Sequence, residues 1–129
     1  MIYLKYFLES KSDKPKIKKH EIDGFVVFQG KDASANEYLT LEVATDEDIW
    51  MHAKGVAGSH VIIKIKDKFP TETTIKRVAK IAAKNSKSED ELVKVVYCKR
   101  KFVKKEPGSN VGQVKVDYIN AYEIFVTKN

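Results

Sequence analysis

The sequence predicts an α+β fold in which a mixed, mostly antiparallel sheet carries one clear helix at about 71–86 and one short helix at about 33–43. Two patterns support this prediction. Several short runs alternate apolar and polar residues, which is the period of a strand, and one longer run repeats apolar residues at helical spacing. Since 129 residues is the size of one ordinary domain, we expect residues 1–129 to form a single domain.

Before the first helix, one strand is well marked. Residues 1–10 alternate loosely and fit either a strand or a short helix, whereas the charged, proline-containing stretch 11–20 is expected to be a connector. The run GFVVFQG at 24–30 is rich in β-forming residues and bounded by glycines, which predicts a strand. The next segment begins with helix-capping residue types, and its apolar residues then recur in steps of four, which predicts the helix at 33–43.

Two further alternating runs, DIWMHAK at 48–54 and HVIIKIK at 60–66, are predicted to be neighbouring antiparallel strands with one face on the core. The opposite face carries a mixture of aromatic and basic side chains, namely Trp50, His52, Lys54, His60, Lys64 and Lys66. If the strands pair through a short loop at 55–58, His52 and His60 lie roughly opposite each other.

The C-terminal half is predicted to contain a helix and three strands. In 71–86, apolar residues recur at i, i+3, i+4 and i+7, with basic residues mostly on the other side. A strand in 92–105 runs into a series of basic residues and is followed by the turn EPGSN. Segments 111–118 and 122–127 are predicted to be a last pair of strands, joined by a tight link at 119–121.

Composition argues against several classes of protein. No run approaches the roughly 18 to 20 apolar residues that span a bilayer. The apolar start of the chain is followed by lysines, the reverse of a secretory signal. We therefore expect a cytoplasmic protein with no membrane partner. Cys98 is the only cysteine, which excludes an internal disulfide and a cysteine-based zinc cluster within one chain.

Catalysis and cofactor binding find little support in the sequence. Ser59 and His60 are adjacent, so on a strand their side chains point to opposite faces, and no nucleophile-elbow motif accompanies them. His52 and His60 could share a metal ion, but no third ligand at suitable spacing is evident. The glycine spacing resembles neither the Walker loop nor the dinucleotide fingerprint. We predict no catalytic residue, metal or cofactor, and keep an enzyme that uses both histidines as an alternative.

The basic character of the chain favours binding to a large anion. The formal net charge is +6, and rings beside lysines are the combination that RNA-binding surfaces use for base stacking and phosphate neutralisation. A second basic region comprises Lys99, Arg100, Lys101, Lys104 and Lys105. Structural interpretations stay open, because Trp50 can pack in a core, both histidines can be satisfied structural residues, and the basic region can be a solvated turn.

Four segments, in order, resemble a known family. DIWMHAKGVAGSHVIIK at 48–64 is similar to the signature of the NFACT-R domain, the RNA-binding module of a family of ribosome quality-control factors. GFVVFQGKDASANEYLT, IKRVAKIAAKNSKS and VVYCKRKFVKKEPGSNVGQVKV resemble further segments of that domain, so that the likeness covers about 22–127. Two departures concern turn geometry: Gln29 stands where many relatives have a glycine, and Ala57 where bacterial ones often have proline.

The resemblance implies RNA binding, because full-length members bind tRNA and the obstructed large ribosomal subunit during quality control of stalled nascent chains. The family's signature residues fall here on Asp48, Trp50, His52, Gly58, Ser59 and His60, and its basic stretch on Lys101, Lys104 and Lys105. The large N-terminal domain, helix–hairpin–helix segment and coiled coil of those members do not fit within 129 residues, so we expect the isolated module.

We therefore predict a non-enzymatic RNA-binding module whose ligand is tRNA or ribosomal RNA. Trp50, His52 and His60 are predicted to contact bases or sugars. Gly55 and Gly58, the latter beside Ser59, are predicted to let the loop backbone approach the RNA. The residues predicted to hold phosphates are Lys54, Lys64, Lys99, Arg100, Lys101, Lys104 and Lys105. Two alternatives remain: a module that binds or senses DNA, and a module that docks on a ribosomal or quality-control protein.

Overall fold

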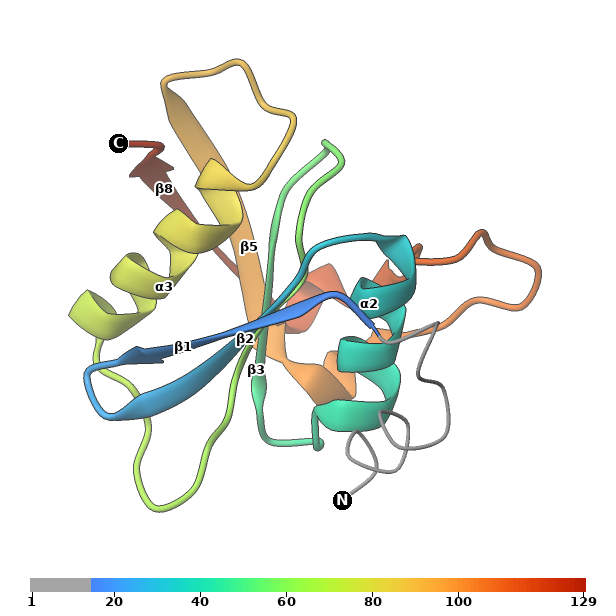
Figure 1. Cartoon of the computed structure of the whole chain (residues 1–129), viewed down its shortest axis with the longest axis horizontal. Helices are drawn as coiled ribbons and strands as arrows, with labels where there is room; N and C mark the ends of the chain where they lie inside the picture. Colours follow the sequence, from blue (N-terminus) through green and yellow to red (C-terminus); the bar gives the residue numbers. More distant parts are fainter. Residues whose placement is uncertain (1–14) are drawn as a thin grey trace.

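Six antiparallel strands form the main sheet of the computed structural model, which describes residues 15–129 (Figure 1). Their order across the sheet is β1-β2-β4-β3-β5-β8. The strands are β1 (Ile17–Ile22), β2 (Phe25–Gly30), β3 (Ile49–Ala53), β4 (Val61–Ile63), β5 (Leu92–Lys99) and β8 (Tyr122–Thr127). A second sheet pairs two short strands, β6 (Val103–Lys104) and β7 (Lys115–Val116). Together with the helices packed on the sheet, these strands confirm the predicted α+β class.

Helix α3 (Glu72–Lys84) covers one face of the main sheet. Its N-cap is Thr71, whose hydroxyl accepts a hydrogen bond from the Thr74 amide over 3.2 Å, and it ends just before Asn85. The helix predicted at 71–86 is therefore confirmed. Several of its buried residues are alanines, and such small side chains let the helix lie close to the strands and complete the larger hydrophobic core.

Helix α2 (Ala33–Tyr38) and the π-helical turn that continues it (Leu39–Val43) cover the opposite face, together with β6 and β7 (Figure 1). The helical segment thus spans 33–43, as predicted. Beneath it lies a second core that contains Trp50 and Ile62. The expectation that the sheet has only one face on a core is wrong, because a second layer of the fold covers the face that was expected to be mixed and basic.

The connector predicted at 11–20 is corrected, because residues from Ile17 onward form β1. β1 and β2 make a hairpin whose turn is Asp23–Gly24, with φ angles of 51° and 84°. Two consecutive residues with positive φ give the tight turn whose twist matches antiparallel strands. The expectations for 1–10 and 11–14 fall outside the described residues.

The predicted pairing of the last two strands is wrong. β8 pairs with β5, with Ile124 opposite Val95, whereas β7 pairs with β6, with Val116 opposite Val103. The 3₁₀ helix Tyr118–Asn120 separates β7 from β8, and another, Arg100–Phe102, separates β5 from β6. β8 joins the main sheet because its apolar side chains extend the core under α3. In the part of the chain from 15 to 129, no helix is long and apolar enough to cross a membrane.

Candidate functional site

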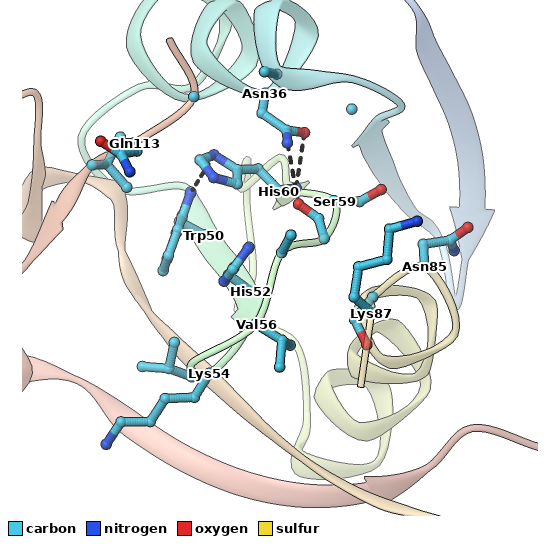
Figure 2. Close-up of a pocket in the computed structure, with 18 of the residues that line it drawn as sticks. Asn36, Trp50, His52, Lys54, Val56, Ser59, His60, Asn85, Lys87 and Gln113 are labelled. Atoms are coloured by element: carbon cyan, nitrogen blue, oxygen red, sulfur yellow. Dashed lines mark hydrogen bonds between the residues drawn. The ribbon is translucent and has the colours of Figure 1, made fainter. Parts of the chain in front are cut away.

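An open pocket of about 1040 Å³ lies where β3 and β4 end at the loop that joins them (Figure 2). We call it the β3–β4 pocket; its walls come mainly from segments 29–36, 50–60, 84–87 and 106–118. About half of the residues predicted from the sequence line it, namely Trp50, His52, Lys54, Gly55, Gly58, Ser59 and His60. The others are not among its lining residues: Lys64, Lys99, Arg100, Lys101, Lys104 and Lys105.

Three rings form the floor of the pocket. The register of β3 and β4 ends with Met51 opposite Val61, so the next residues, His52 and His60, lie side by side as the alternation predicts, with ring centroids 5.2 Å apart in a T-shaped arrangement. Trp50 stacks on His52 at 5.9 Å and meets His60 edge-on at 5.2 Å. Trp50 is 2% exposed and His60 3%, so their ring faces are covered in this conformation, whereas His52 is half-buried.

Hydrogen bonds fix the orientation of the His60 ring. The Thr40 hydroxyl lies 2.8 Å from His60 Nδ1, and the Trp50 indole N–H donates to Thr40 Oγ1 over 3.1 Å and lies 3.3 Å from the same Nδ1. An indole N–H can only donate, so Nδ1 is an acceptor. The proton of neutral His60 is therefore on Nε2, which makes that atom the donor of the ring.

Asn36 fixes the backbone around the same ring. Its Oδ1 accepts a hydrogen bond from the His60 amide over 3.0 Å, and its Nδ2 donates to the Gly58 carbonyl over 3.2 Å. The Gly30 amide in turn donates to the His60 carbonyl over 3.0 Å. A Cβ atom at Gly30 would lie 2.1 Å from Asn36 Oδ1, so only glycine permits this contact.

The loop between β3 and β4 is held against the end of α3. The Ser59 amide donates to the Asn85 carbonyl over 3.0 Å, and the Lys87 amide donates to the Ala57 carbonyl over 2.8 Å. Gly58 forms an isolated bridge with Ser86, where an added Cβ would lie 2.9 Å from Ser86 Cα. The pocket is thus built from fixed backbone on both sides.

The floor is electrically neutral near physiological pH. Burial, together with the neighbouring His52 imidazole, lowers the pKa of His60 to about 3. Burial also lowers the pKa of His52. Both rings therefore offer hydrogen-bonding atoms and ring surface without a positive charge.

Exposed lysines stand at the rim of the pocket. Lys31 follows β2, and Lys84 and Lys87 lie at the end of α3. Within residues 15–129, none of the three makes an ion pair. Sequence reasoning did not select these residues as ligands. The sequence contains only a weak signal for them: each lies at or just after the end of a helix or strand, where the chain enters a loop.

Lys64 and Asp48 have structural roles. Asp48 is fully buried; its Oδ2 lies 2.5 Å from Lys64 Nζ and accepts from the Thr45 amide, and its Oδ1 accepts from the Ile65 amide. Lys64 also donates to the Val43 carbonyl over 3.2 Å. The pair therefore ties β4 to the segment before β3.

Lys105 holds the 106–113 turn closed. Its ammonium lies 2.7 Å from Glu37 Oε1 and donates to the carbonyls of Asn110 and Gln113 over 2.5 and 3.1 Å. Glu37 Oε1 also accepts from the Gly112 amide over 3.0 Å, and these bonds lower the pKa of Glu37. Lys105 thereby joins α2 to the wall of the pocket.

The remaining cations of the basic region lie on a separate surface. Lys99 and Lys101 both pair with Glu47, at 2.8 and 3.2 Å, and Arg100 Nε donates to the Thr40 carbonyl over 2.7 Å. Lys104 is exposed on β6. Lys54, at the pocket, pairs with Glu123.

Cys98 is buried, and burial raises the pKa of its thiol to about 11, far from the range of a reactive thiolate. Across residues 15–129, no group of three or more His, Cys, Asp or Glu side chains is arranged to hold a metal ion.

Comparisons with known proteins agree with the resemblance. The family described as "NFACT protein RNA binding domain" matches residues 14–117. The Rqc2 homolog RqcH of Bacillus subtilis is 40% identical over 121 residues, which are 92% of this chain and 20% of that protein. The archaeal Rqc2 homolog aRqcH of Methanocaldococcus jannaschii is 34% identical over 73 residues, or 57% of this chain and 11% of that protein.

A solved structure has a similar fold. The C-terminal part of the fibronectin/fibrinogen-binding protein from Streptococcus suis matches with a TM-score of 0.81 and 27% identity, over 88% of this chain and 46% of that one. The chain spans a fifth or less of the length of the curated relatives named above.

Proposed function

Because this chain belongs to the NFACT RNA-binding domain family, we propose that it is a non-enzymatic RNA-binding module and that the β3–β4 pocket with its lysine rim is the contact surface. The ligand is tRNA or ribosomal RNA, and the setting is the quality control of stalled nascent chains on the large ribosomal subunit. Support for this setting comes from the Rqc2-type relatives.

One observation supports the assignment most strongly: a neutral floor of rings lies inside a rim of lysines that have no carboxylate partner among residues 15–129. RNA presents flat uncharged bases next to charged phosphates, so a surface that binds it needs both kinds of group side by side. Within the described part of the chain, Lys31, Lys84 and Lys87 have no ion pair that must break before they meet phosphates.

The roles of the predicted contact residues differ in this proposal. His52 touches the RNA directly, since it is the most accessible of the three rings. Trp50 and His60 hold the floor in place. Both are buried, so only their small exposed part can touch the RNA. Lys99, Lys101 and Lys104 form an outer contact, because exposed ion pairs such as those with Glu47 are weak and a phosphate can replace the carboxylate.

Anisotropy of labelled tRNA across a salt series tests the proposal. The triple variant Lys31→Glu, Lys84→Glu, Lys87→Glu is compared with Lys18→Glu, Lys66→Glu, Lys80→Glu, which makes the same charge change at exposed lysines that do not line the pocket. If three phosphate contacts are lost, the rim variant binds weakly and its log–log salt slope is shallower by about 2.

Two outcomes contradict the proposal. Equal losses in both triple variants would mean that only net charge matters. Duplex DNA that displaces tRNA as well as unlabelled tRNA does would favour the DNA-binding alternative instead.

A further inference from the structure

We infer that the β3–β4 pocket takes one unpaired nucleotide with its base inward, so that the module reads single-stranded or looped RNA and not the face of a duplex. This inference rests on the proposed function and names the kind of RNA that the site accepts.

The depth of the floor argues for an unpaired base. Trp50, Ser59 and His60 are buried, and the walls around them come from segments on several sides. In an A-form helix the major groove is too narrow to admit side chains, and the minor-groove base edges lie on a shallow surface that cannot enter a recess. A base that is splayed out of a loop or a single strand can enter it. The volume of about 1040 Å³ is ample for one nucleotide, since pockets for small ligands span roughly 300 to 1,000 Å³.

The chemistry of the floor fits an uncharged aromatic ligand. His52 is the outer ring of the stack that it makes with Trp50, at 17° between planes, so a base lying on His52 would extend an existing stack. Figure 2 shows His52, Val56 and Ser59 around this part of the pocket, while Lys54 turns away from it toward Glu123. Stacking on a ring tolerates any base, because every base has a π-face.

The charged and the uncharged groups of the pocket lie in different places, which suits a nucleotide with an uncharged base and charged phosphates. Cations stand at the rim, at Lys31, Lys84 and Lys87, and the rings lie at the floor. The carboxylates of Asp32 and Glu106 also line the pocket. Asp32 is the N-cap of α2 and accepts a hydrogen bond from the Ala35 amide over 2.8 Å. A nucleotide placed with its base on His52 leaves its two phosphodiesters at the level of these lysines.

The floor is preorganised for such a ligand. Asn36 and Thr40 hold His60 from its backbone and from its ring, and Lys105 closes the 106–113 wall. A rigid site loses little conformational freedom when a ligand enters, and it can therefore discriminate between single-stranded and paired RNA.

Competition against labelled tRNA tests the inference. The competitors are a single-stranded RNA hexamer and a blunt-ended RNA duplex of the same sequence, and the variants are His52→Ala and, as a control, Phe125→Ala, which removes an exposed aromatic ring that does not line the pocket. We expect the hexamer to compete at least tenfold better than the duplex. The His52→Ala variant should lose about tenfold in hexamer affinity, as removal of a stacking ring does, and the Phe125→Ala variant should bind like wild type.

A second readout uses the wild-type protein, so that it does not depend on whether a variant folds. In NMR spectra, the imidazole Cε1–H signals of His52 and His60 should shift on titration with the hexamer, and that of His20, which is linked to the pocket through Gln29, should shift less. A duplex that competes as well as the hexamer, or histidine signals at the pocket that stay in place, would overturn the inference while tRNA binding persists. Failure of tRNA itself to bind would overturn the proposed function as well.

Discussion

Asn36 and His60 are joined by a hydrogen bond from the His60 amide to the Asn36 side-chain oxygen, 3.0 Å long, across 24 residues of sequence. The same carboxamide donates to the Gly58 carbonyl. One side chain on α2 therefore sets the backbone of the loop that carries the predicted contact residues. A loop positioned in this way is part of the folded scaffold, and changes to α2 should alter the pocket without touching a ligand.

The Asn36→Ala substitution tests this relationship. It leaves a buried amide and a carbonyl without partners, so we expect the free energy of unfolding to fall by about 1 to 3 kcal/mol. Urea denaturation measures the change. Ser34→Ala, an exposed position of the same helix, is the control and should stay within about 0.5 kcal/mol of wild type. Equal stability of both variants would show that Asn36 does not hold the loop.

The Gly30→Ala substitution should be costly for a steric reason. Its Cβ would lie 2.1 Å from Asn36 Oδ1, so either the strand or the helix must move, and we expect a loss of about 1 to 3 kcal/mol. At Gly55 a Cβ meets nothing within 4 Å, but φ is 78°, so Gly55→Ala should lose only about 1 kcal/mol from backbone strain. Thermal unfolding of the two variants compares these costs, and a milder loss at Gly30 than at Gly55 would contradict the packing described above.

Stability should fall with acidification through His60. Its pKa is about 3 in the folded protein, against about 6.5 for an unperturbed histidine. Between these values the unfolded chain binds a proton that the folded chain does not, so the unfolding free energy decreases as pH falls, approaching about 1.4 kcal/mol per pH unit. Above pH 6.5 both states are neutral and this contribution is constant.

Urea titrations at pH 7.5, 6.5 and 5.5 measure this dependence before most carboxylates titrate. His60→Gln should make the profile shallower, and the slope that remains is expected to include a contribution from His52, whose pKa burial also lowers. An unchanged slope in the His60→Gln variant would assign the acid sensitivity to other groups.

Two adjacent lysines should behave differently. Lys105 holds the carbonyls of Asn110 and Gln113, whereas Lys104 is exposed. We expect Lys105→Ala to speed amide hydrogen exchange throughout 106–113 and Lys104→Ala to leave it unchanged, because only the first releases the turn. Hydrogen-exchange mass spectrometry resolves this peptide. Equal exchange in both variants would mean that the turn is held by its other contacts.

Local pattern was enough to predict some of these features. The helix at 71–86 follows from its apolar spacing, and the side-by-side placement of His52 and His60 follows from the two-residue period of strands that share a short loop. Both depend only on neighbours in sequence. The β1–β2 hairpin also has a local sequence signal, the Asp23–Gly24 turn. The high charge of the preceding stretch nevertheless led to the prediction of a connector.

The second layer and the ion pairs could not be predicted in the same way. Trp50 is buried because the helical segment at 33–43 folds over it, and nothing in the sequence around residue 50 encodes that contact. Lys99 and Lys105 were predicted to hold phosphates, and in the structure they pair with Glu47 and Glu37, which are distant in sequence. A lysine shows its charge in the sequence, and only the fold shows whether another residue already neutralises it.

The walls of the pocket come from segments that are distant in the sequence, so ligand binding should stabilise the whole domain against unfolding. A ligand in the β3–β4 pocket touches four stretches of chain that separate when the protein unfolds, so it acts as a non-covalent crosslink. A ligand that binds only the folded state stabilises it by about 2.7 kcal/mol at a hundredfold excess over its dissociation constant. Such a module would be hardest to unfold while its RNA is bound, and most susceptible to proteolysis after the RNA dissociates.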